Sequence, residues 1–376
     1  MRVCRFLGFA VVFVFILVAM PLATEAQSCS SPYYVEQRFP VAGPEETQWR
    51  ICWQMQHKFG LVITSAHFRK SPTSPWIRVF WDARVAEIFV PYHDDSNRFY
   101  DIMGFNWNWV PLAAADCPAS LGGKLLGTGP DVCKQVRDRG FAWKKDDQLR
   151  RGEELVLWGA IAAANYNYIT EWTFRDDGVI LGRVGATGLN YPPHPFVNHV
   201  HDPIWRLDID LDGFAGDSVH LGTHTEFVPT PAKATDTEPM ISTETGLDWD
   251  PVNFHSLQIH DANLKNVKGN PSAYHLIPLP TGGLSRHQED FTKHDFWVTL
   301  YNPTEMFAAK LPSYIKPPQS VENADIVVWY KGSMHHQVRD EDGEIVKGFW
   351  SGEAHVMWTG FMLKPHNLFD RTPLFP

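Results

Sequence analysis

The sequence predicts a mainly β protein, folded as a large antiparallel β-sandwich. Short strand-like stretches recur along the chain, and segments with helical periodicity are scarce. Many short strands without alternating helices favour a sandwich over an α/β fold. The expected strands, in chain order, are 61–68, 77–81, 154–163, 168–174, 179–184, 204–211, 296–301, 326–330 and 354–362.

Turn signals separate these strands and support their assignment. Asp176-Asp177-Gly178 lies between strands 168–174 and 179–184 and is typical of a tight turn. The strand at 204–211 alternates apolar and polar residues and ends at the turn Asp212-Gly213. The polar segment from Pro229 to Gly246 is rich in Thr and Pro, so we expect a long surface loop there. We find no repeat and no composition shift, which predicts one domain over residues 27–376.

The first 26 residues have the features of a secretion signal. Arg2 and Arg5 precede an apolar run at 6–20, and small residues at 24–26 favour cleavage after Ala26. The alternative is an uncleaved N-terminal anchor. Since no other long apolar run occurs, we expect a secreted, extracellular protein with no membrane segment in its mature form.

The charge balance bears on the class of partner. The formal net charge is −10 with histidine neutral, and loss of Arg2, Arg5 and Glu25 would leave −11. An acidic exported protein is a poor candidate for binding nucleic acid or anionic lipid. Its charge is compatible with a cationic substrate.

Four cysteines remain after the signal: Cys29, Cys52, Cys117 and Cys133. An even number in an exported chain favours disulfides, and three pairings are possible. We prefer Cys29–Cys52 and Cys117–Cys133, since each closes a short local loop. No Cys-x-x-Cys motif occurs, so a thiolate metal site is not expected.

A metal site is indicated by a histidine pair. His199 and His201 lie two residues apart at the start of an alternating strand, so both imidazoles point to one face. A third histidine from the run Met334-His335-His336 would complete a three-imidazole site, which suits copper or zinc. Zinc would give a hydrolase or lyase, whereas copper leaves positions for dioxygen. The alternative is a pair of surface histidines beside a loop.

The type of ligand does not separate copper from zinc, and a neighbouring tyrosine motif gives only a hint toward copper. The tetrapeptide Asn165-Tyr166-Asn167-Tyr168 follows the strand at 154–163. A tyrosine beside such a metal is a candidate for oxidation, which suggests an oxidase that makes its own quinone from Tyr166. The alternative is a core tyrosine whose hydroxyl is satisfied by a hydrogen bond.

In this order the motifs resemble the catalytic domain of the copper amine oxidases, which carry topaquinone. Asn165-Tyr166-Asn167 matches the family's Asn-Tyr-Asp/Glu cofactor motif, and His199 and His201 match its first two copper ligands. Segment 325–330, followed by His335-His336 and Glu341-Asp342, matches the region of the third ligand. The spacing to that acidic pair assigns the ligand to His336 and not His335. The similarity runs, with gaps, from about Trp49 to the C-terminus.

The resemblance also implies roles for other residues. Segments 87–92 and 99–101 are similar to the stretch that carries a gate tyrosine and the catalytic base, which implies Tyr92 and Asp101. Asn165 would belong to the cofactor site with Tyr166. Burial among aromatic residues would raise the pKa of Asp101 and suit it to proton removal; capping a turn is the alternative. A peripheral calcium site is implied at Asp208, Asp210 and Asp325, which could instead be solvated strand ends.

The chain departs from the family pattern at several positions. Asn167 replaces the carboxylate after the quinone tyrosine, Ala162 stands where threonine is usual, and Ile102-Met103-Gly104-Phe105 follows Asp101. The resemblance nevertheless implies a secreted primary-amine oxidase that uses dioxygen and releases aldehyde, ammonia and hydrogen peroxide, and a homodimer. Two alternatives stay open. One is a zinc or copper enzyme with three histidines and no quinone, and the other is a catalytically inactive secreted binding relative.

Overall fold

The computed structural model describes residues 29–39, 46–93, 97–129, 131–191, 193–214, 216–227, 233–339, 345–346, 349–350, 354–371 and 373. The predicted signal at 1–26, with cleavage near Ala26, lies outside the described residues. So does the acidic pair Glu341-Asp342.

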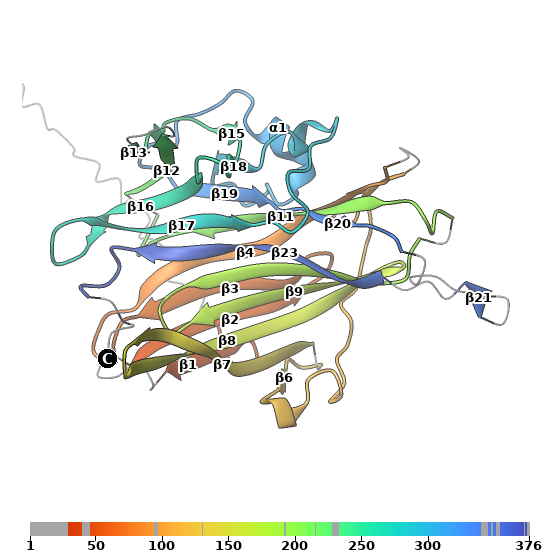
Figure 1. Cartoon of the computed structure of the whole chain (residues 1–376), viewed down its shortest axis with the longest axis horizontal. Helices are drawn as coiled ribbons and strands as arrows, with labels where there is room; N and C mark the ends of the chain where they lie inside the picture. Colours follow the sequence, from red (N-terminus) through yellow and green to blue (C-terminus); the bar gives the residue numbers. More distant parts are fainter. Residues whose placement is uncertain are drawn as a thin grey trace, which may run out of the picture.

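Two large antiparallel sheets make up the molecule (Figure 1). In the described chain the first sheet has ten strands, in the spatial order β1 (Tyr34–Phe39), β2 (Thr47–Gln56), β3 (Gly60–Arg69), β4 (Ile77–Pro91), β11 (His199–Ile209), β19 (Ile326–Lys331), β18 (Phe296–Leu300) and β15 (Thr245–Leu247), with β5 (Arg98–Tyr100) beside β4 and β20 (Met334–His336) beside β11.

The second sheet has eleven described strands. Their order is β13 (Lys233–Thr237), β12 (Asp217–Phe227), β16 (Ser256–Lys265), β17 (Pro271–Leu279), β23 (Ala354–His366), β10 (Ile180–Gly188), β9 (Tyr166–Arg175), β8 (Gln148–Ala163), β7 (Val132–Lys145) and β6 (Lys124–Leu126), with β14 (Met240–Ile241) beside β12. A separate pair is formed by β21 (Ile345–Val346) and β22 (Phe349–Trp350).

Aromatic side chains join the two sheets. Trp49 on β2 packs against Phe174 on β9 with ring centroids 5.1 Å apart, and Phe80 on β4 meets Trp172 on β9 at 5.8 Å. Near the middle of the sheets, Trp205 on β11 contacts Phe361 on β23 at 5.3 Å. These rings belong to one buried apolar cluster. The predicted antiparallel sandwich is therefore confirmed, because its core lies between two facing sheets.

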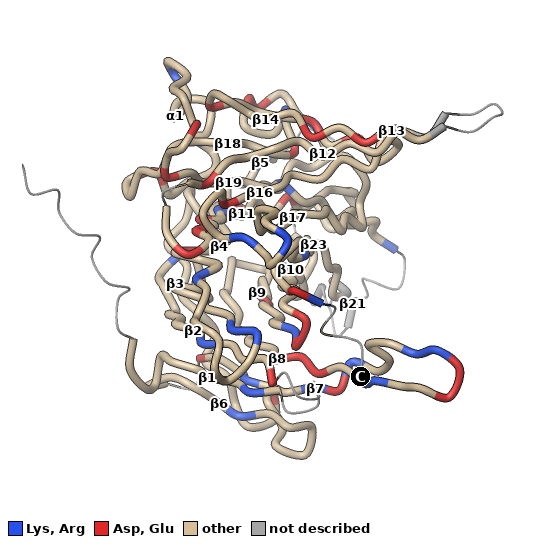
Figure 2. Tube along the Cα trace, turned by 90° about the vertical axis from the view of Figure 1, so that its left-hand side faces the viewer, with Lys and Arg blue, Asp and Glu red and all other residues tan. Residues whose placement is uncertain are grey.

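The expected strands are all present, although most are longer than predicted. The segment 229–246, expected as a loop, contains the short strands β13 and β14 and the start of β15; residues 234–240 are exposed. Helix is limited to α1 (Leu311–Tyr314) and short 3-10 turns in the described chain. None of the described helices is long and apolar enough to cross a membrane. Figure 2 shows basic and acidic residues interspersed along the trace.

Two disulfides close local loops near the ends of strands. Cys29 is joined to Cys52 on β2, and Cys117 is joined to Cys133 on β7. Both pairs have Cα atoms 5.7 Å apart, within the usual range for a disulfide. The preferred pairing is confirmed.

Strand β11 is the element that positions the site. All eleven of its residues are buried, which fits a central strand covered on both faces. It pairs with β4 on one side and with β19 and β20 on the other. Since successive side chains of a strand point to opposite faces, β11 supplies polar groups to two separate buried regions.

Candidate metal and cofactor centre

Three histidines meet between the sheets. His199 and His201 lie on the same face of β11, and the pairing of β11 with β20 sets His336 directly opposite His199. The ligand atoms of all three lie within 4.8 Å of one another, and all three residues are buried. His335 instead lies opposite Val200, is exposed, and stacks on His93 with ring centroids 5.3 Å apart. The structure thus gathers His336, not its neighbour, into the triad.

The donor atoms of this triad fit a metal ion. His199 Nδ1 is 2.9 Å from the carbonyl of Val197, a contact that directs its Nε2 toward the centre. His201 Nε2 is buried and has no hydrogen-bond partner among the described residues. Burial lowers the pKa of His199 to about 3 and that of His201 well below its ordinary value, which keeps both imidazoles neutral. Three neutral imidazole nitrogens are a donor set for copper or zinc.

Tyr166 lies against this triad. Its hydroxyl is 3.0 Å from His199 Nε2 and 3.2 Å from His336 Nδ1. Burial, with a further contribution from the neighbouring Tyr92, raises the pKa of Tyr166 far above its ordinary value, so the phenol is protonated in the metal-free site. The sequence prediction that this tyrosine lies beside the histidines therefore agrees with the geometry.

A tight turn delivers Tyr166 to this position. Strands β8 and β9 are joined by the two residues Ala164 and Asn165, with Ala164 at a φ of 53°. Asn165 fixes the turn, because its Nδ2 donates to the carbonyl of Leu189 at 2.6 Å. Gly188, opposite Tyr166 on β10, has a φ of 123°, and a Cβ there would lie 2.4 Å from the Asn165 carbonyl oxygen. Asn165 thus positions the tyrosine through the backbone.

Tyr168 is a site residue to which our sequence analysis assigned no role. Its hydroxyl donates to Asp101 Oδ2 at 2.6 Å and lies 2.9 Å from His201 Nδ1. It therefore bridges the expected base and one imidazole. The sequence contains a signal for this role. Tyr166 and Tyr168 lie two residues apart on a strand, so their side chains share a face, as do those of His199 and His201.

Asp101 is buried with its carboxylate held by Tyr168. Burial raises its pKa to about 7, and the hydrogen bond from Tyr168 opposes part of this rise. The backbone also fixes it, since its N–H donates to the Ile88 carbonyl at 2.9 Å and its own carbonyl accepts from the Trp107 indole. A carboxylate with a pKa near neutrality can accept a proton at neutral pH.

Behind Asp101 lies a second buried carboxyl that our sequence analysis missed. Glu87 Oε1 accepts the backbone N–H groups of Ile102 at 2.8 Å and of Ile88 at 3.0 Å, so it fixes the turn that follows Asp101. Burial raises the pKa of Glu87 to about 8, and the charge of Asp101 adds to this effect. No sequence motif marked it, because its role is to accept the backbone N–H groups of a turn 15 residues further along the chain.

Tyr92 closes one side of the triad. Its ring stacks on His199 with centroids 4.2 Å apart and planes 12° apart, and it is buried. Tyr92 and His199 also form a backbone bridge between the end of β4 and the start of β11. Tyr92 therefore contacts both an imidazole and, through the hydroxyl of Tyr166, the candidate cofactor residue.

A cavity of about 210 Å³ leads to these groups. Asp101, Tyr166 and Tyr92 line it together, and Asn165 lies at its wall. The remaining described wall is apolar and aromatic, made by Val90, Phe99, Phe105, Trp107, Ala163, Ala164 and Tyr191. A small molecule in this cavity would meet the tyrosine hydroxyl and the carboxylate at once.

The predicted calcium ligands lie elsewhere. Asp208 and Asp210 are buried on β11, with Arg206 Nη1 3.6 Å from Asp208 and Arg78 Nε 3.0 Å from Asp210. Burial raises the pKa of both and raises that of Asp325 to about 6. In the described part of the chain only the histidine triad forms a compact group with metal-ligand spacing. Calcium at the three aspartates stays a prediction.

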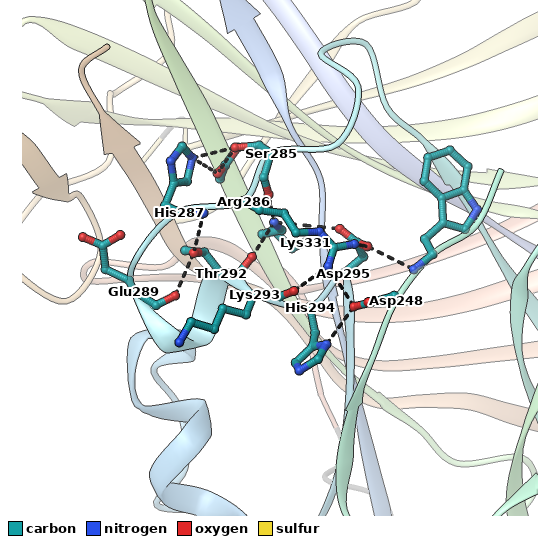
Figure 3. Close-up of polar contacts among 12 residues, drawn as sticks. Asp248, Ser285, Arg286, His287, Glu289, Thr292, Lys293, His294, Asp295 and Lys331 are labelled. Carbon is teal, nitrogen blue, oxygen red and sulfur yellow. Dashed lines mark hydrogen bonds and ion pairs between the residues drawn. The ribbon is translucent and has the colours of Figure 1, made fainter. Parts of the chain in front are cut away.

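A second polar cluster, of Ser285, His287 and Asp202, lies on the other face of β11 (Figure 3). Ser285 Oγ is 2.8 Å from Asp202 Oδ2 and 2.6 Å from His287 Nε2. Figure 3 shows the serine and the histidine side by side. Asp202 Oδ2 also approaches His287 Nε2, at 3.2 Å. In a hydrolytic triad the carboxylate binds the imidazole nitrogen opposite the serine. Since serine and carboxylate here share one nitrogen, this is a structural cluster and not an acyl-transfer site.

The fold and the site together define a class: a β-sandwich protein with a buried cluster of three histidines at metal-ligand spacing and a tyrosine against it. Residues 196–375 match the family model for the copper amine oxidase, enzyme domain. The resemblance to copper amine oxidases found in the sequence is therefore confirmed, for this part of the chain by the family model and for most of it by relatives.

Named relatives extend the match toward the N-terminus. The copper-containing amine oxidase gamma 1 of Arabidopsis thaliana is 27% identical over 410 residues, which cover 87% of this chain and 56% of that protein. The primary amine oxidase of Pisum sativum is 22% identical and is covered to 58%. The chain thus spans somewhat over half the length of these relatives.

A solved structure shows the same fold. The copper-containing benzylamine oxidase from Hansenula polymorpha superimposes with a TM-score of 0.69 at 19% identity. The match covers 91% of this chain and 62% of that one.

Proposed function

We propose that this chain is a copper- and topaquinone-dependent oxidase of primary amines. One observation carries the proposal: the Tyr166 hydroxyl contacts two of three clustered imidazoles, and Asp101 lines the same cavity. The copper amine oxidase match supports the coarser statement that the chemistry is amine oxidation.

His199, His201 and His336 would hold the copper ion, and Tyr166 would be the precursor of the quinone. When bound, these groups supply the redox chemistry through which dioxygen takes up the two electrons removed from the amine. His201 Nε2, buried without a partner in the described structure, is the donor most evidently placed for the metal.

The other residues would handle the substrate and its protons. Asp101 would accept the proton from the carbon next to nitrogen, because its pKa of about 7 leaves much of it ionised at neutral pH. Tyr168 would hold this carboxylate in place, and Tyr92 and Asn165 would keep Tyr166 oriented. The aromatic wall would exclude water from the reacting carbon.

In the overall reaction, a primary amine, dioxygen and water would give an aldehyde, ammonia and hydrogen peroxide. Under this proposal residues 27–376 form the catalytic domain, secreted after removal of the signal near Ala26. The domain would act as a homodimer and would carry calcium at Asp208, Asp210 and Asp325.

Mass spectrometry of the peptide that contains Tyr166 tests the proposal. After loading with copper in air, Tyr166 should gain two oxygen atoms and lose two hydrogen atoms, and the protein should become pink. Tyr166→Phe should bind copper yet stay colourless and inactive. Tyr168→Phe is the matched control and should still show the modified Tyr166. An unmodified tyrosine in copper-loaded, aerated protein would refute the quinone and favour a non-quinone metal site or an inactive relative.

A further inference from the structure

Four histidines outside the triad form a row across the second sheet. They come from neighbouring strands: His220 on β12, His260 on β16, His275 on β17 and His366 on β23 (Figure 1). In this order their ring centroids are 4.5, 6.2 and 4.7 Å apart. We propose that His275 and His366 form a second metal site, which binds a divalent transition-metal ion of the kind that imidazole favours. This site is independent of the function proposed for the triad.

The row lies on the outer face of the second sheet. Tyr274 and Leu276, on either side of His275 in the sequence, are fully buried in the core between the sheets. Since successive side chains of a strand point to opposite faces, His275 points away from that core. His275 is half-buried and His366 is exposed. An ion in solution can therefore reach this pair without entering the space between the sheets.

The register of β17 and β23 brings the two histidines together. His275 lies opposite Lys364, two residues before His366, so the histidines are diagonal neighbours on one face. Their ring planes are 11° apart and their centroids 4.7 Å apart. The centroids of His199 and His336 in the triad are 4.6 Å apart, so the spacing suits two ligands of one ion. A turn of the exposed His366 ring, whose outer torsion angle is broadly distributed, would direct nitrogens of both rings to that ion.

One nitrogen of His275 is left unsatisfied by the protein. Its Nε2 is buried and has no hydrogen-bond partner among the described residues. Burial lowers the pKa of His275 to about 3, with smaller contributions from His366 and His260, so this imidazole is neutral at pH 7. A neutral imidazole has one acceptor nitrogen, and a buried polar atom without a partner costs free energy. A metal ion bound to the acceptor nitrogen would remove that cost.

The other pair of the row, His220 and His260, differs in its hydrogen bonds. His220 Nε2 lies 3.1 Å from Ser218 Oγ, and its Nδ1 lies 3.0 Å from the Glu238 carbonyl. His260 Nε2 lies 3.0 Å from the amide oxygen of Gln258. The two rings are as close as those of the first pair, at 4.5 Å, but contacts within the protein already engage both nitrogens of one ring and one nitrogen of the other. This second pair is therefore a structural contact and a natural control.

Lys364 opposes the binding of a cation at this site. It is exposed, lies opposite His275, and its charge contributes to the lowered pKa of that histidine. With two imidazoles and a positive charge nearby, the site should bind more weakly than the triad. Lys364→Gln removes the charge and should tighten binding by about threefold at low ionic strength. An unchanged affinity in this variant would contradict a metal ion beside His275.

Calorimetric titration with zinc chloride, on the full chain already loaded with one equivalent of copper, tests the proposal. Copper should fill the triad first, because copper binds nitrogen ligands more tightly than zinc does. One further equivalent of zinc should then bind. His366→Ala changes an exposed residue and should weaken this binding by at least about tenfold, since even the hydrogen-bond partners of a metal ligand are worth about 10–100-fold in affinity. His275→Ala should have the same effect.

His220→Ala and His260→Ala are the matched controls from the same row, and both should keep the zinc equivalent. Its retention in His366→Ala, or an equal loss in the two controls, would overturn the proposal. Thermal unfolding gives a second readout, because an ion bound only by the folded state stabilises it. Zinc should raise the unfolding temperature of the copper-loaded wild type more than that of His366→Ala, and equal shifts would overturn the proposal. Copper content is measured separately, so a failure of the function proposed for the triad is distinguishable.

Discussion

Two buried polar regions lie on opposite faces of β11, and their difference separates a reactive site from a structural one. On one face, His201 has a ring nitrogen with no partner in the described structure. On the other, the Lys331 ammonium donates to the carbonyls of Ser285 and Thr292, and Asp295 lies 3.8 Å away. Asp202 Oδ1 on that second face also has no hydrogen-bond partner among the described residues. What separates the two faces is therefore the convergence of three imidazoles with metal-ligand spacing on the first face.

The sharpest test of this contrast removes one imidazole. His336→Ala should abolish high-affinity copper binding and, with it, the oxidation of Tyr166, because two imidazoles remain where three converge. Metal analysis after dialysis measures the first effect and mass spectrometry the second. His335→Ala is the control, since His335 points away from the triad. Copper retained in His336→Ala and lost in His335→Ala would show that the register of β20 differs from the one described here.

The second largest effect is expected on the rate of turnover, with the metal still bound. Asp101→Asn keeps the shape of the side chain and removes the proton acceptor, so reduction by amine should slow by about two to four orders of magnitude. Copper content and reaction with a hydrazine should persist, because neither requires proton removal from substrate. Stopped-flow absorbance of the cofactor measures the rate. A near-normal rate would assign the base to another group.

A smaller effect is expected on the pH dependence of kcat/KM, and its direction follows from the pKa of Asp101. With a pKa of about 7, Asp101 is protonated in acid, so kcat/KM should fall about tenfold per pH unit well below pH 7. The Tyr168 hydrogen bond lowers this pKa. Tyr168→Phe should therefore raise it and move the acidic limb of the profile to higher pH. A shift toward lower pH would contradict the hydrogen bond between these residues.

A change on the other face of β11, where Lys331 lies, should lower the free energy of unfolding and leave the copper content unchanged. Lys331→Met leaves the Ser285 and Thr292 carbonyls without their donor and weakens the surroundings of Asp295, which should cost about 3–5 kcal/mol of unfolding free energy. Denaturant titration measures this loss, and copper per folded molecule should be unchanged. Lys293→Met is the matched control, because Lys293 forms an exposed pair with Asp290 and its loss should change little. Equal effects of the two changes would contradict the role given to Lys331.

The smallest expected effect lies away from both regions. Replacing Cys117 and Cys133 by alanine opens a loop with a sequence separation of 16, which the chain-entropy estimate values at about 3 kcal/mol. The unfolding transition should shift to lower denaturant concentration, while the triad still binds copper. Loss of copper binding in the folded double variant would show that this loop supports the centre.

The residues that the sequence revealed are those whose chemistry depends on local spacing. His199 and His201 share a face because a strand alternates with period two, and the turn after Ala163 places Tyr166 at the start of β9. Strand alternation also explains why nine strands were found. The longer strands β1, β2, β7, β12, β16 and β17 were not predicted, and neither were the short strands β5, β6, β13, β14, β15, β20, β21 and β22. Strands β7 and β16 are partly exposed, so their apolar signal is weaker than that of β11; β2 is mostly buried, and its polar residues interrupt the apolar pattern.

The residues that the sequence did not reveal act through distant partners. Glu87 binds the backbone of residues 102 and 103, Tyr168 joins Asp101 to His201, and Asp202 meets Ser285 and His287. The Tyr168 and Asp202 contacts form only when segments far apart in the chain become neighbours. The Glu87 contact forms when the turn after Asp101, 15 residues further along the chain, folds back on β4. A single sequence contains no record of such pairings, so side chains like Glu87 look the same as ordinary strand residues until the sheets are assembled.

His199 on β11 lies opposite His336 on β20, and this pairing determines at what stage of folding the protein can oxidise itself. These residues are 137 positions apart, so an unfolded chain contains no site able to concentrate copper beside Tyr166. A slip of β20 by one residue would also bring His335 opposite His199 in place of His336 and change the set of donors. Under the proposed function, oxygen chemistry at the tyrosine is therefore confined to molecules that have completed folding in the correct register. Nascent and misfolded chains would be spared self-oxidation.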